Sequence, residues 1–223
     1  MGAIDILVNN SGVSTTQKLV DVSPEDYDFV MGTNTRGAFF VAQEVAKRMI
    51  ARSKGEAPGT YTGGRIVNVA SMGGFTPSKF MSAYNTSKAA VMMLGDCLRA
   101  ELADKGIHVA TICPGLSITN ITQSTRFVGL DAHAEAEKQA RATKLYQRRN
   151  LTPDKIAKAI LDAVEHRRDE VPVGAPHERR DVMIAVTAAR EILRRLHDVM
   201  ASKANAQAKL NQVVGIVAEQ LTS

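Results

Sequence analysis

The sequence contains no tryptophan, few aromatic residues and no long apolar run. No apolar stretch approaches the roughly 18 residues that a membrane-spanning helix needs, and no signal-peptide pattern opens the chain, so the sequence predicts a cytoplasmic protein without membrane contact. The net charge is +5, but only 4% of the residues are aromatic and the basic side chains are dispersed. This distribution argues against a nucleic-acid-binding face, so we expect no nucleic-acid partner.

Cysteines are also sparse. The two cysteines, Cys97 and Cys113, lie inside apolar segments and have neither the CxxC spacing of a metal site nor the pattern of a disulfide framework. None of the five histidines is paired with another at zinc-ligand spacing. We therefore predict no metal site, and a reducing cytosol would suit both thiols.

Apolar and amphipathic segments alternate along most of the chain. Its 223 residues, of which 44% are hydrophobic, fit one large α/β domain better than two independent domains. Short apolar runs predict buried parallel strands at residues 4–8, 65–70, 107–113 and 170–174. Stripes with helical spacing predict helices from 23 to the loop at 53–64, from 83 to 105, and from 153 onward.

Two further regions are predicted to be helical. The polar region 117–150 is too long for a simple connection, so we expect helical lid segments there, in which Arg126 is a candidate contact for an acidic substrate. Residues 177–223 form two amphipathic helices, and we favour an extension packed back on the domain at 1–176. Basic residues such as Arg194 leave a subunit contact or a membrane-surface helix open as alternatives.

Ser71, Tyr84 and Lys88 are the strongest candidates for a catalytic centre. Tyr84 and Lys88 lie one turn apart on one face of the helix predicted from 83 to 105, so the ammonium can sit beneath the phenol. Ser71 follows the strand at 65–70, at the carboxyl end where open α/β sheets place their ligand crevices. Turn residues between Ser71 and Tyr84 allow the serine to return beside the helix. The spacing therefore predicts a proton-transfer centre.

Five motifs, in matching order and spacing, resemble those of the short-chain dehydrogenase/reductase family. They are Asn9-Asn10-Ser11-Gly12 after an apolar strand, Asn34 on the apolar stripe of the next helix, Ser71, the Tyr84-x-x-x-Lys88 pair, and Pro114-Gly115-x-x-x-Thr119. The resemblance covers about residues 2–174. It implies a doubly wound, Rossmann-like parallel sheet of the α/β class.

The resemblance also implies a function. It implies an NAD(P)-dependent oxidoreductase that interconverts a carbonyl and a secondary alcohol by hydride transfer, with Tyr84 as general acid/base. Ser71 would hold the substrate oxygen, and Asn34 would position a water that links Lys88 to solvent. Family members usually form homodimers or homotetramers, and their substrates are small carbonyl compounds or alcohols.

The cofactor residues are likewise implied by the resemblance. Lys88, beside Tyr84, would hold the nicotinamide ribose. Asn10 and Gly12 would line the adenosine side, and Thr119 with the Pro114-Gly115 backbone would contact the carboxamide. We favour NADP over NAD, although the residues that decide between them are not identified.

An unperturbed tyrosine titrates near pH 10, so Tyr84 would need a pKa about 3 lower, or about 4 kcal/mol, to act near pH 7. We expect the Lys88 ammonium and the positive nicotinamide ring to lower the pKa of Tyr84 together, and Lys88 alone to fall short.

The sequence departs from the family pattern in two places. Ser11 stands where the family usually has alanine, a change that we expect to be tolerated. The family's first strand, Gly-x-x-x-Gly-x-Gly turn and helix have no counterpart before residue 4, so residues 1–176 correspond to the C-terminal two-thirds of a family domain. We expect an N-terminally truncated sheet with an exposed apolar edge at 4–8, and no saturable NADPH binding by these 223 residues alone. The alternative function is therefore a noncatalytic family member that acts as a subunit or interaction partner.

Overall fold

The computed structural model describes residues 3–55, 63–119 and 121–174, with isolated residues between 196 and 212. The chain divides into two compact units, Met1–Ala175 and Pro176–Ser223, and the architecture below is that of the first. Nearly all of the helical extension predicted for 177–223 lies outside the described residues. Within the described part of the chain, no helix is both long and apolar enough to cross a membrane.

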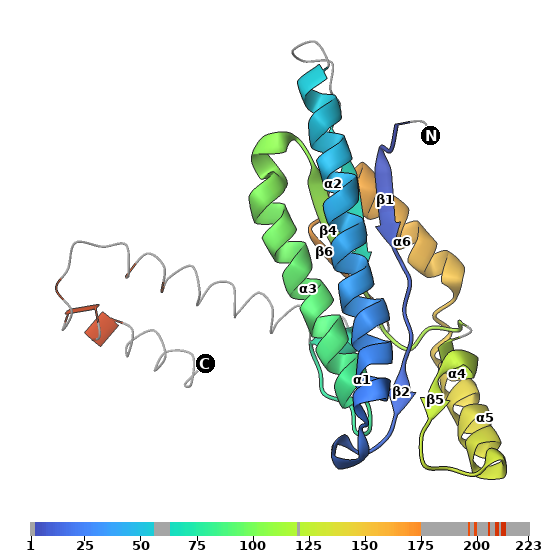
Figure 1. Cartoon of the computed structure of the whole chain (residues 1–223). Helices are drawn as coiled ribbons and strands as arrows, with labels where there is room; N and C mark the ends of the chain where they lie inside the picture. The colour runs from blue at the N-terminus through green and yellow to red at the C-terminus, as the bar shows by residue number, and fades with distance from the viewer. Residues whose placement is uncertain are drawn as a thin grey trace. The chain divides into compact units, whose positions relative to one another are not determined.

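Strands and helices alternate along the first unit (Figure 1). The strands are β1 (Ile6–Asn9), β2 (Thr15–Thr16), β3 (Arg65–Val69), β4 (His108–Pro114), β5 (Arg126–Phe127) and β6 (Glu170–Val173). The α-helices are α1 (Pro24–Met31), α2 (Ala38–Gly55), α3 (Ser82–Leu102), α4 (Ile121–Ser124), α5 (Ala132–Arg149) and α6 (Pro153–Glu165). Short helical segments are η1 (Leu19–Asp21), η2 (Gly32–Gly37), η3 (Met72–Gly74) and η4 (Ala103–Lys105).

Four parallel strands form the central sheet in the order β1-β3-β4-β6. On one face, Ile66 of β3 packs in a buried cluster with Met49 of α2 and Leu102 of α3. On the other face, Val67 packs with Ala163 of α6. Neighbouring residues of β3 thus face helices on opposite sides, because side chains alternate along a strand. This arrangement confirms the predicted doubly wound parallel α/β fold.

The first strand forms an edge of the described sheet. Ile6 and Val8 are 50% and 41% exposed, whereas β3 is buried along most of its length. The exposed apolar edge expected at residues 4–8 is therefore present. A parallel edge with apolar side chains offers unpaired backbone groups to another strand.

Capping features mark the start of α1 and the end of the helical region after α3. Ser23 Oγ accepts a hydrogen bond from the Asp26 backbone N–H at 3.1 Å, and Pro24 opens α1. The reciprocal half of a capping box does not form, because the Asp26 carboxylate accepts from Gln17 Nε2 at 3.2 Å. After α3 and η4, Gly106 adopts a left-handed conformation with a φ of 68°, which ends the helical region.

The long helix predicted to start at residue 23 is interrupted. A π-helical segment, η2, separates α1 from α2, and the buried Asn34 lies inside it. The periodicity argument missed this segment because one widened turn hardly changes an apolar stripe. Single π-helical turns occur frequently at functional sites, so the interruption draws attention to Asn34.

The lid region contains both expected and unexpected structure. Helices α4 and α5 fall within the region predicted to be helical, but β5 pairs in parallel with β2, and neither strand was predicted. Each contains two residues, which is too short for a periodic pattern. In Figure 1 these elements lie beyond the carboxyl ends of the central strands, on the side where ligand crevices form.

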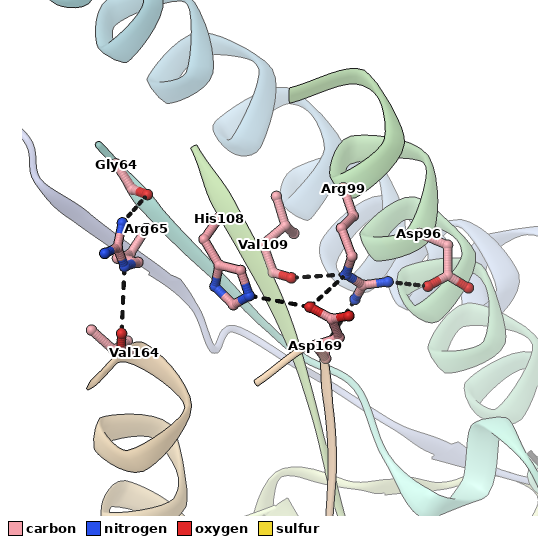
Figure 2. Close-up of polar contacts among 8 residues, drawn as sticks. All are labelled: Gly64, Arg65, Asp96, Arg99, His108, Val109, Val164 and Asp169. Carbon is pink, nitrogen blue, oxygen red and sulfur yellow. Dashed lines mark hydrogen bonds and ion pairs between the residues drawn. The ribbon is translucent and has the colours of Figure 1, made fainter. Parts of the chain in front are cut away.

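A polar cluster at the opposite, amino-terminal ends of the strands ties α3 to the sheet (Figure 2). The Arg99 guanidinium donates to the carbonyl oxygens of Val109 (3.1 Å) and Asp169 (2.9 Å), and forms an ion pair with Asp96. His108 Nε2 lies 3.2 Å from Asp169 Oδ1. The cluster stabilises the fold at a distance from the Ser71 end of β3.

His108 should make the protein acid-sensitive. Burial lowers the pKa of His108, and this effect outweighs the neighbouring Asp169 carboxylate, which raises it. The unfolded chain therefore binds the proton more readily, so the His108 contribution to stability is complete above the ordinary histidine pKa and is lost as the pH falls below it. We expect His108→Gln to flatten the decline in unfolding free energy between pH 7 and pH 5, measured by urea denaturation at each pH. Parallel curves for the two proteins would contradict this.

Candidate active site

Tyr84 and Lys88 lie in the first two turns of α3, near the carboxyl ends of the strands. Lys88 is only 4% exposed, and its ammonium donates to the carbonyl oxygen of Val69 at 3.0 Å. Lys88 Nζ lies 5.8 Å from the centroid of the Tyr84 ring. The structure thus places the ammonium and the aromatic ring together on one face of the helix.

Ser71 reaches this pair from the end of β3. It is the N-cap of η3, and its Oγ accepts from the Gly73 N–H at 3.1 Å. A Cβ on Gly73 would lie 2.8 Å from Asn85 Oδ1 and 3.6 Å from Tyr84 Cε1, so a glycine lets this turn lie against α3. The Ser71 hydroxyl lies 3.4 Å from the Pro114 carbonyl oxygen and lowers the pKa of Tyr84. Because serine has one proton and 3.4 Å is long, the hydroxyl is able to turn toward a ligand.

The protein groups around Tyr84 raise the pKa of its phenol. Burial raises the pKa of Tyr84, the hydrogen bond from Ser71 opposes that rise, and Tyr146 adds to it. Lys88 was expected to lower the pKa of Tyr84 together with the nicotinamide ring and to fall short alone, and in the protein its Nζ donates to the Val69 carbonyl oxygen. The protein groups therefore hold Tyr84 as a neutral phenol at pH 7.

The pKa of Lys88 is shifted in the opposite direction. Burial lowers its pKa to about 8, because the charged form is poorly solvated between α3 and the sheet. The ammonium is thus charged at neutral pH and loses its proton in mildly alkaline solution. A lysine whose pKa lies this close to neutral pH is typical of a functional site.

Asn34 is fixed by three hydrogen bonds to residues far away in the sequence. Its Oδ1 accepts from the Val13 N–H at 2.8 Å, and its Nδ2 donates to the Val13 carbonyl oxygen and to Ser87 Oγ, both at 2.9 Å. Ser87 in turn donates to the Tyr84 carbonyl oxygen at 2.7 Å. Asn34 therefore connects the segment after β1 with the first turns of α3.

Gly12 completes the group of residues around Lys88. A Cβ at this position would lie 3.3 Å from Lys88 Nζ and 3.7 Å from Asn34 Oδ1. The backbone thus approaches both polar groups closely, and the amide of the next residue, Val13, is held by Asn34. The structure brings together Gly12, Asn34, Lys88 and the Ser71–Tyr84 pair.

The other predicted cofactor residues line the same edge of the sheet. Pro114 ends β4, and the Gly115 N–H donates to the Val173 carbonyl oxygen at 2.7 Å. Asn10 and Thr119 are exposed, and Thr119 Oγ1 accepts from the Ile121 N–H at 3.4 Å where α4 starts. Within the described ranges, neither Asn10 nor Thr119 bonds Tyr84 or Lys88.

A polar row across the sheet was not predicted. Asn9 Nδ2 donates to Asn68 Oδ1 at 2.9 Å and to the Ala38 carbonyl oxygen at 3.2 Å. Asn9, Asn68 and Thr111 are register partners on β1, β3 and β4. An asparagine inside the apolar run at 65–70 was the available signal, since a buried amide needs a partner on a neighbouring strand.

Tyr146 of α5 was also missed. It is partly buried on an otherwise largely exposed helix, and it lies near enough to Tyr84 to raise the pKa of that phenol. The Leu151 carbonyl oxygen, just beyond α5, accepts from the Ile118 N–H at 2.8 Å, which anchors the end of this helix at the exit of β4. Sequence spacing carries no signal for such a contact. In the described part of the chain, no three potential metal ligands gather.

Comparison with known proteins decides the family. The family model for short chain dehydrogenases matches residues 1–127, which include every predicted site residue from Asn10 to Thr119. The chain belongs to the short-chain dehydrogenase family.

Individual family members show how far the similarity extends. The chain is 38% identical over 174 residues to the probable oxidoreductase EphD of Mycobacterium tuberculosis, a match that covers 77% of the chain and 28% of the relative. A short-chain dehydrogenase from Sphingobium yanoikuyae in complex with NADPH superposes with a TM-score of 0.66 and 25% identity, over 92% of this chain and 69% of that one.

A second similar structure contains NADP and tartrate. The gluconate 5-dehydrogenase from Burkholderia cenocepacia, in complex with NADP and tartrate, gives a TM-score of 0.60 and 28% identity over 78% of this chain and 64% of that one. This chain spans between 28% and 52% of the length of these curated relatives.

Proposed function

We propose that this protein is an NAD(P)-dependent oxidoreductase that interconverts a carbonyl and a secondary alcohol. The observation that carries the proposal is the cluster of Ser71, Tyr84 and Lys88, which combines a hydrogen-bond donor, a phenol and a cation at the carboxyl edge of the sheet. Family membership and the oxidoreductase names of the relatives support the same reaction class.

In the direction of reduction, the substrate oxygen lies between Ser71 and Tyr84. Negative charge develops on this oxygen as the carbonyl carbon is reduced, and the Ser71 hydroxyl stabilises it by a hydrogen bond. Tyr84 then transfers its phenolic proton to the oxygen, which breaks the tyrosine O–H bond and forms the alcohol O–H bond. The Lys88 ammonium stabilises the phenolate that remains. Burial raises the pKa of Tyr84, so at pH 7 its phenol carries the proton that reduction needs.

The residues around Lys88 fit a nicotinamide cofactor. Among the described residues Lys88 makes one hydrogen bond, to Val69, and lysine has three N–H donors, so the ammonium retains donors for ribose hydroxyls. The absent Cβ of Gly12 leaves this wall open beside Lys88. When bound, the reduced nicotinamide supplies the hydride. The residues that would hold the cofactor are Asn10, Gly12, Tyr84, Lys88, Pro114, Gly115 and Thr119. NADP is favoured because two similar structures contain NADPH or NADP.

The test is substrate-dependent oxidation of NADPH by the native protein. We expect loss of NADPH absorbance only when a ketone is added, with a panel that includes plain ketones and keto acids of the gluconate type. NADPH oxidation that is independent of every ketone, or no oxidation with any of them, would contradict the proposal. Because relatives with similar folds act on gluconates, keto acids are the first substrates to assay.

The pH dependence of reduction should follow Lys88. Its pKa of about 8 means that the ammonium is charged at pH 7 and neutral at pH 9. We therefore expect kcat/KM for ketone reduction to be level between pH 6 and pH 7 and to fall above about pH 8, by up to about tenfold per pH unit. A profile that stays level to pH 10 would show that the charge on Lys88 does not assist the proton transfer.

A noncatalytic role is the second candidate, and one observation favours it. Strand β1 is an edge of the described sheet, and its Ile6 and Val8 are exposed. Its unpaired backbone groups could hydrogen-bond a strand of another protein. If this is the function, the native protein should bind a full-length family member and should fail every turnover assay. Turnover by the native protein alone would rule it out.

A further inference from the structure

The short β2–β5 ladder joins two segments that are distant in the sequence. The Arg126 N–H donates to the Ser14 carbonyl oxygen at 3.1 Å, and the Val128 N–H donates to the Thr16 carbonyl oxygen at 3.2 Å. Ser14 and Thr15 are 1% and 2% exposed although their segment lies outside the central sheet. The lid residues that follow α4 are thus bonded directly to the segment that follows Gly12.

An arginine–aromatic contact reinforces this ladder. The guanidinium carbon of Arg126 lies 3.6 Å from the centroid of the Phe29 ring on α1. Such a stack combines cation–π attraction with dispersion. The side chain of Arg126 therefore contacts α1, and its contact with an acidic substrate stays a prediction.

The segment held in this way is continuous with the candidate active site. Val13 precedes Ser14, and its N–H donates to Asn34 Oδ1 while its carbonyl oxygen accepts from Asn34 Nδ2. Gly12 precedes Val13 and approaches Lys88 Nζ. A displacement of residues 14–16 would be transmitted through only one or two peptide units to Gly12.

We propose that Arg126 and Phe29 are positioning residues of the active site. Their stack holds β5 against β2, which fixes residues 14–16 and thereby keeps Gly12 and Val13 in place beside Lys88 and Asn34. Neither residue contacts a reacting atom in this account. The consequence for catalysis rests on the proposed oxidoreductase function, whereas the positioning itself can be measured without turnover.

Hydrogen exchange and NMR of the full chain test the positioning directly. In Arg126→Gln and in Phe29→Leu, we expect the backbone amides at positions 126 and 128 to exchange about 3- to 30-fold faster than in the native protein. The side-chain amide resonance of Asn34 should shift as well, because Val13 moves. A change confined to the surface would leave that resonance in place. Arg126 is exposed, and Phe29 is half-buried and replaced by another apolar side chain, so the variants are expected to fold.

Two further variants make the test specific. Arg141→Gln removes the same charge from α5 without removing a ring contact, and it should change neither measurement. Phe29→Tyr keeps an aromatic ring and should retain the slow exchange. The Arg126→Gln/Phe29→Leu double variant should exchange no faster than the more affected single variant, since one contact is lost in each case.

Turnover separates this inference from the proposed function. If the native protein reduces a ketone, we expect Arg126→Gln to raise the KM for NADPH at least 3-fold with a smaller change in kcat. Unchanged exchange and an unchanged Asn34 resonance in Arg126→Gln, or additive effects in the double variant, would overturn the positioning role. Faster exchange with a shifted Asn34 resonance would support it even if no ketone is reduced, an outcome that would count only against the oxidoreductase proposal.

Discussion

Replacing Tyr84 with phenylalanine should reduce ketone reduction by the native protein by about 10²- to 10⁴-fold, the usual contribution of a positioned general acid. The substitution removes the phenolic proton and retains the ring that lies 5.8 Å from Lys88 Nζ. The KM for NADPH should therefore change little, and kcat should account for nearly all of the loss. Steady-state kinetics with both substrates varied provide the measurement.

Tyr27→Phe is the matched control for this experiment. Tyr27 is 45% exposed on α1, and removing its hydroxyl should leave kcat within about twofold of the native value. The two variants differ only in where a phenolic oxygen is lost. Near-normal turnover by Tyr84→Phe would exclude Tyr84 as the proton donor, and an equal loss in both variants would point to a general effect on folding.

Replacing Asn34 with alanine should lower the free energy of unfolding by about 3–5 kcal/mol. Three hydrogen bonds are lost, each worth about 1 kcal/mol, and the partly buried backbone groups of Val13 and the Ser87 hydroxyl lose a partner, at an added cost of up to about 2 kcal/mol. Urea denaturation of the full chain measures the change. Activity should fall too, because Val13 loses its bonds to Asn34 and the backbone of Gly12 is no longer held beside Lys88.

Thr35→Val controls for the π-helical segment itself. Thr35 is the next residue, and its hydroxyl makes only long contacts, at 3.5 Å to the Ser87 carbonyl oxygen and 3.8 Å to Met31 Sδ. We expect a loss of at most about 1 kcal/mol. If Asn34→Ala costs no more than Thr35→Val, the three bonds of Asn34 do not support the structure in the way described.

Elements with strong periodicity were predictable from the sequence. The central strands and the major helices lie where apolar runs, caps and stop signals placed them, because burial on a parallel sheet leaves a clear pattern. The proximity of Ser71, Tyr84 and Lys88 followed from helical spacing and from the rule that ligand sites lie at the carboxyl ends of strands. Cytoplasmic location and a homodimer or homotetramer remain predictions.

Features that depend on tertiary contacts were not predictable. The β2–β5 ladder, the π-helical segment and the Asn9–Asn68 bond each arise from neighbours distant in the sequence. The burial that raises the pKa of Tyr84 was not predicted either, and neither was the bond from Lys88 to the Val69 carbonyl oxygen. Spacing identifies which groups meet, and packing determines their protonation.

Transfer of a deuterium label tests the central claim most directly. The native protein would be incubated with a reducible ketone and NADPH that carries deuterium at the transferable position. One reaction would use NADPH labelled on one face of the nicotinamide, and a second reaction NADPH labelled on the other face. The alcohol product of each would be analysed by mass spectrometry. The account predicts deuterium on the carbinol carbon from one labelled face only, and a loss of this product in Tyr84→Phe. An alcohol without label from either cofactor, or equal labelling in the Tyr84→Phe variant, would contradict it.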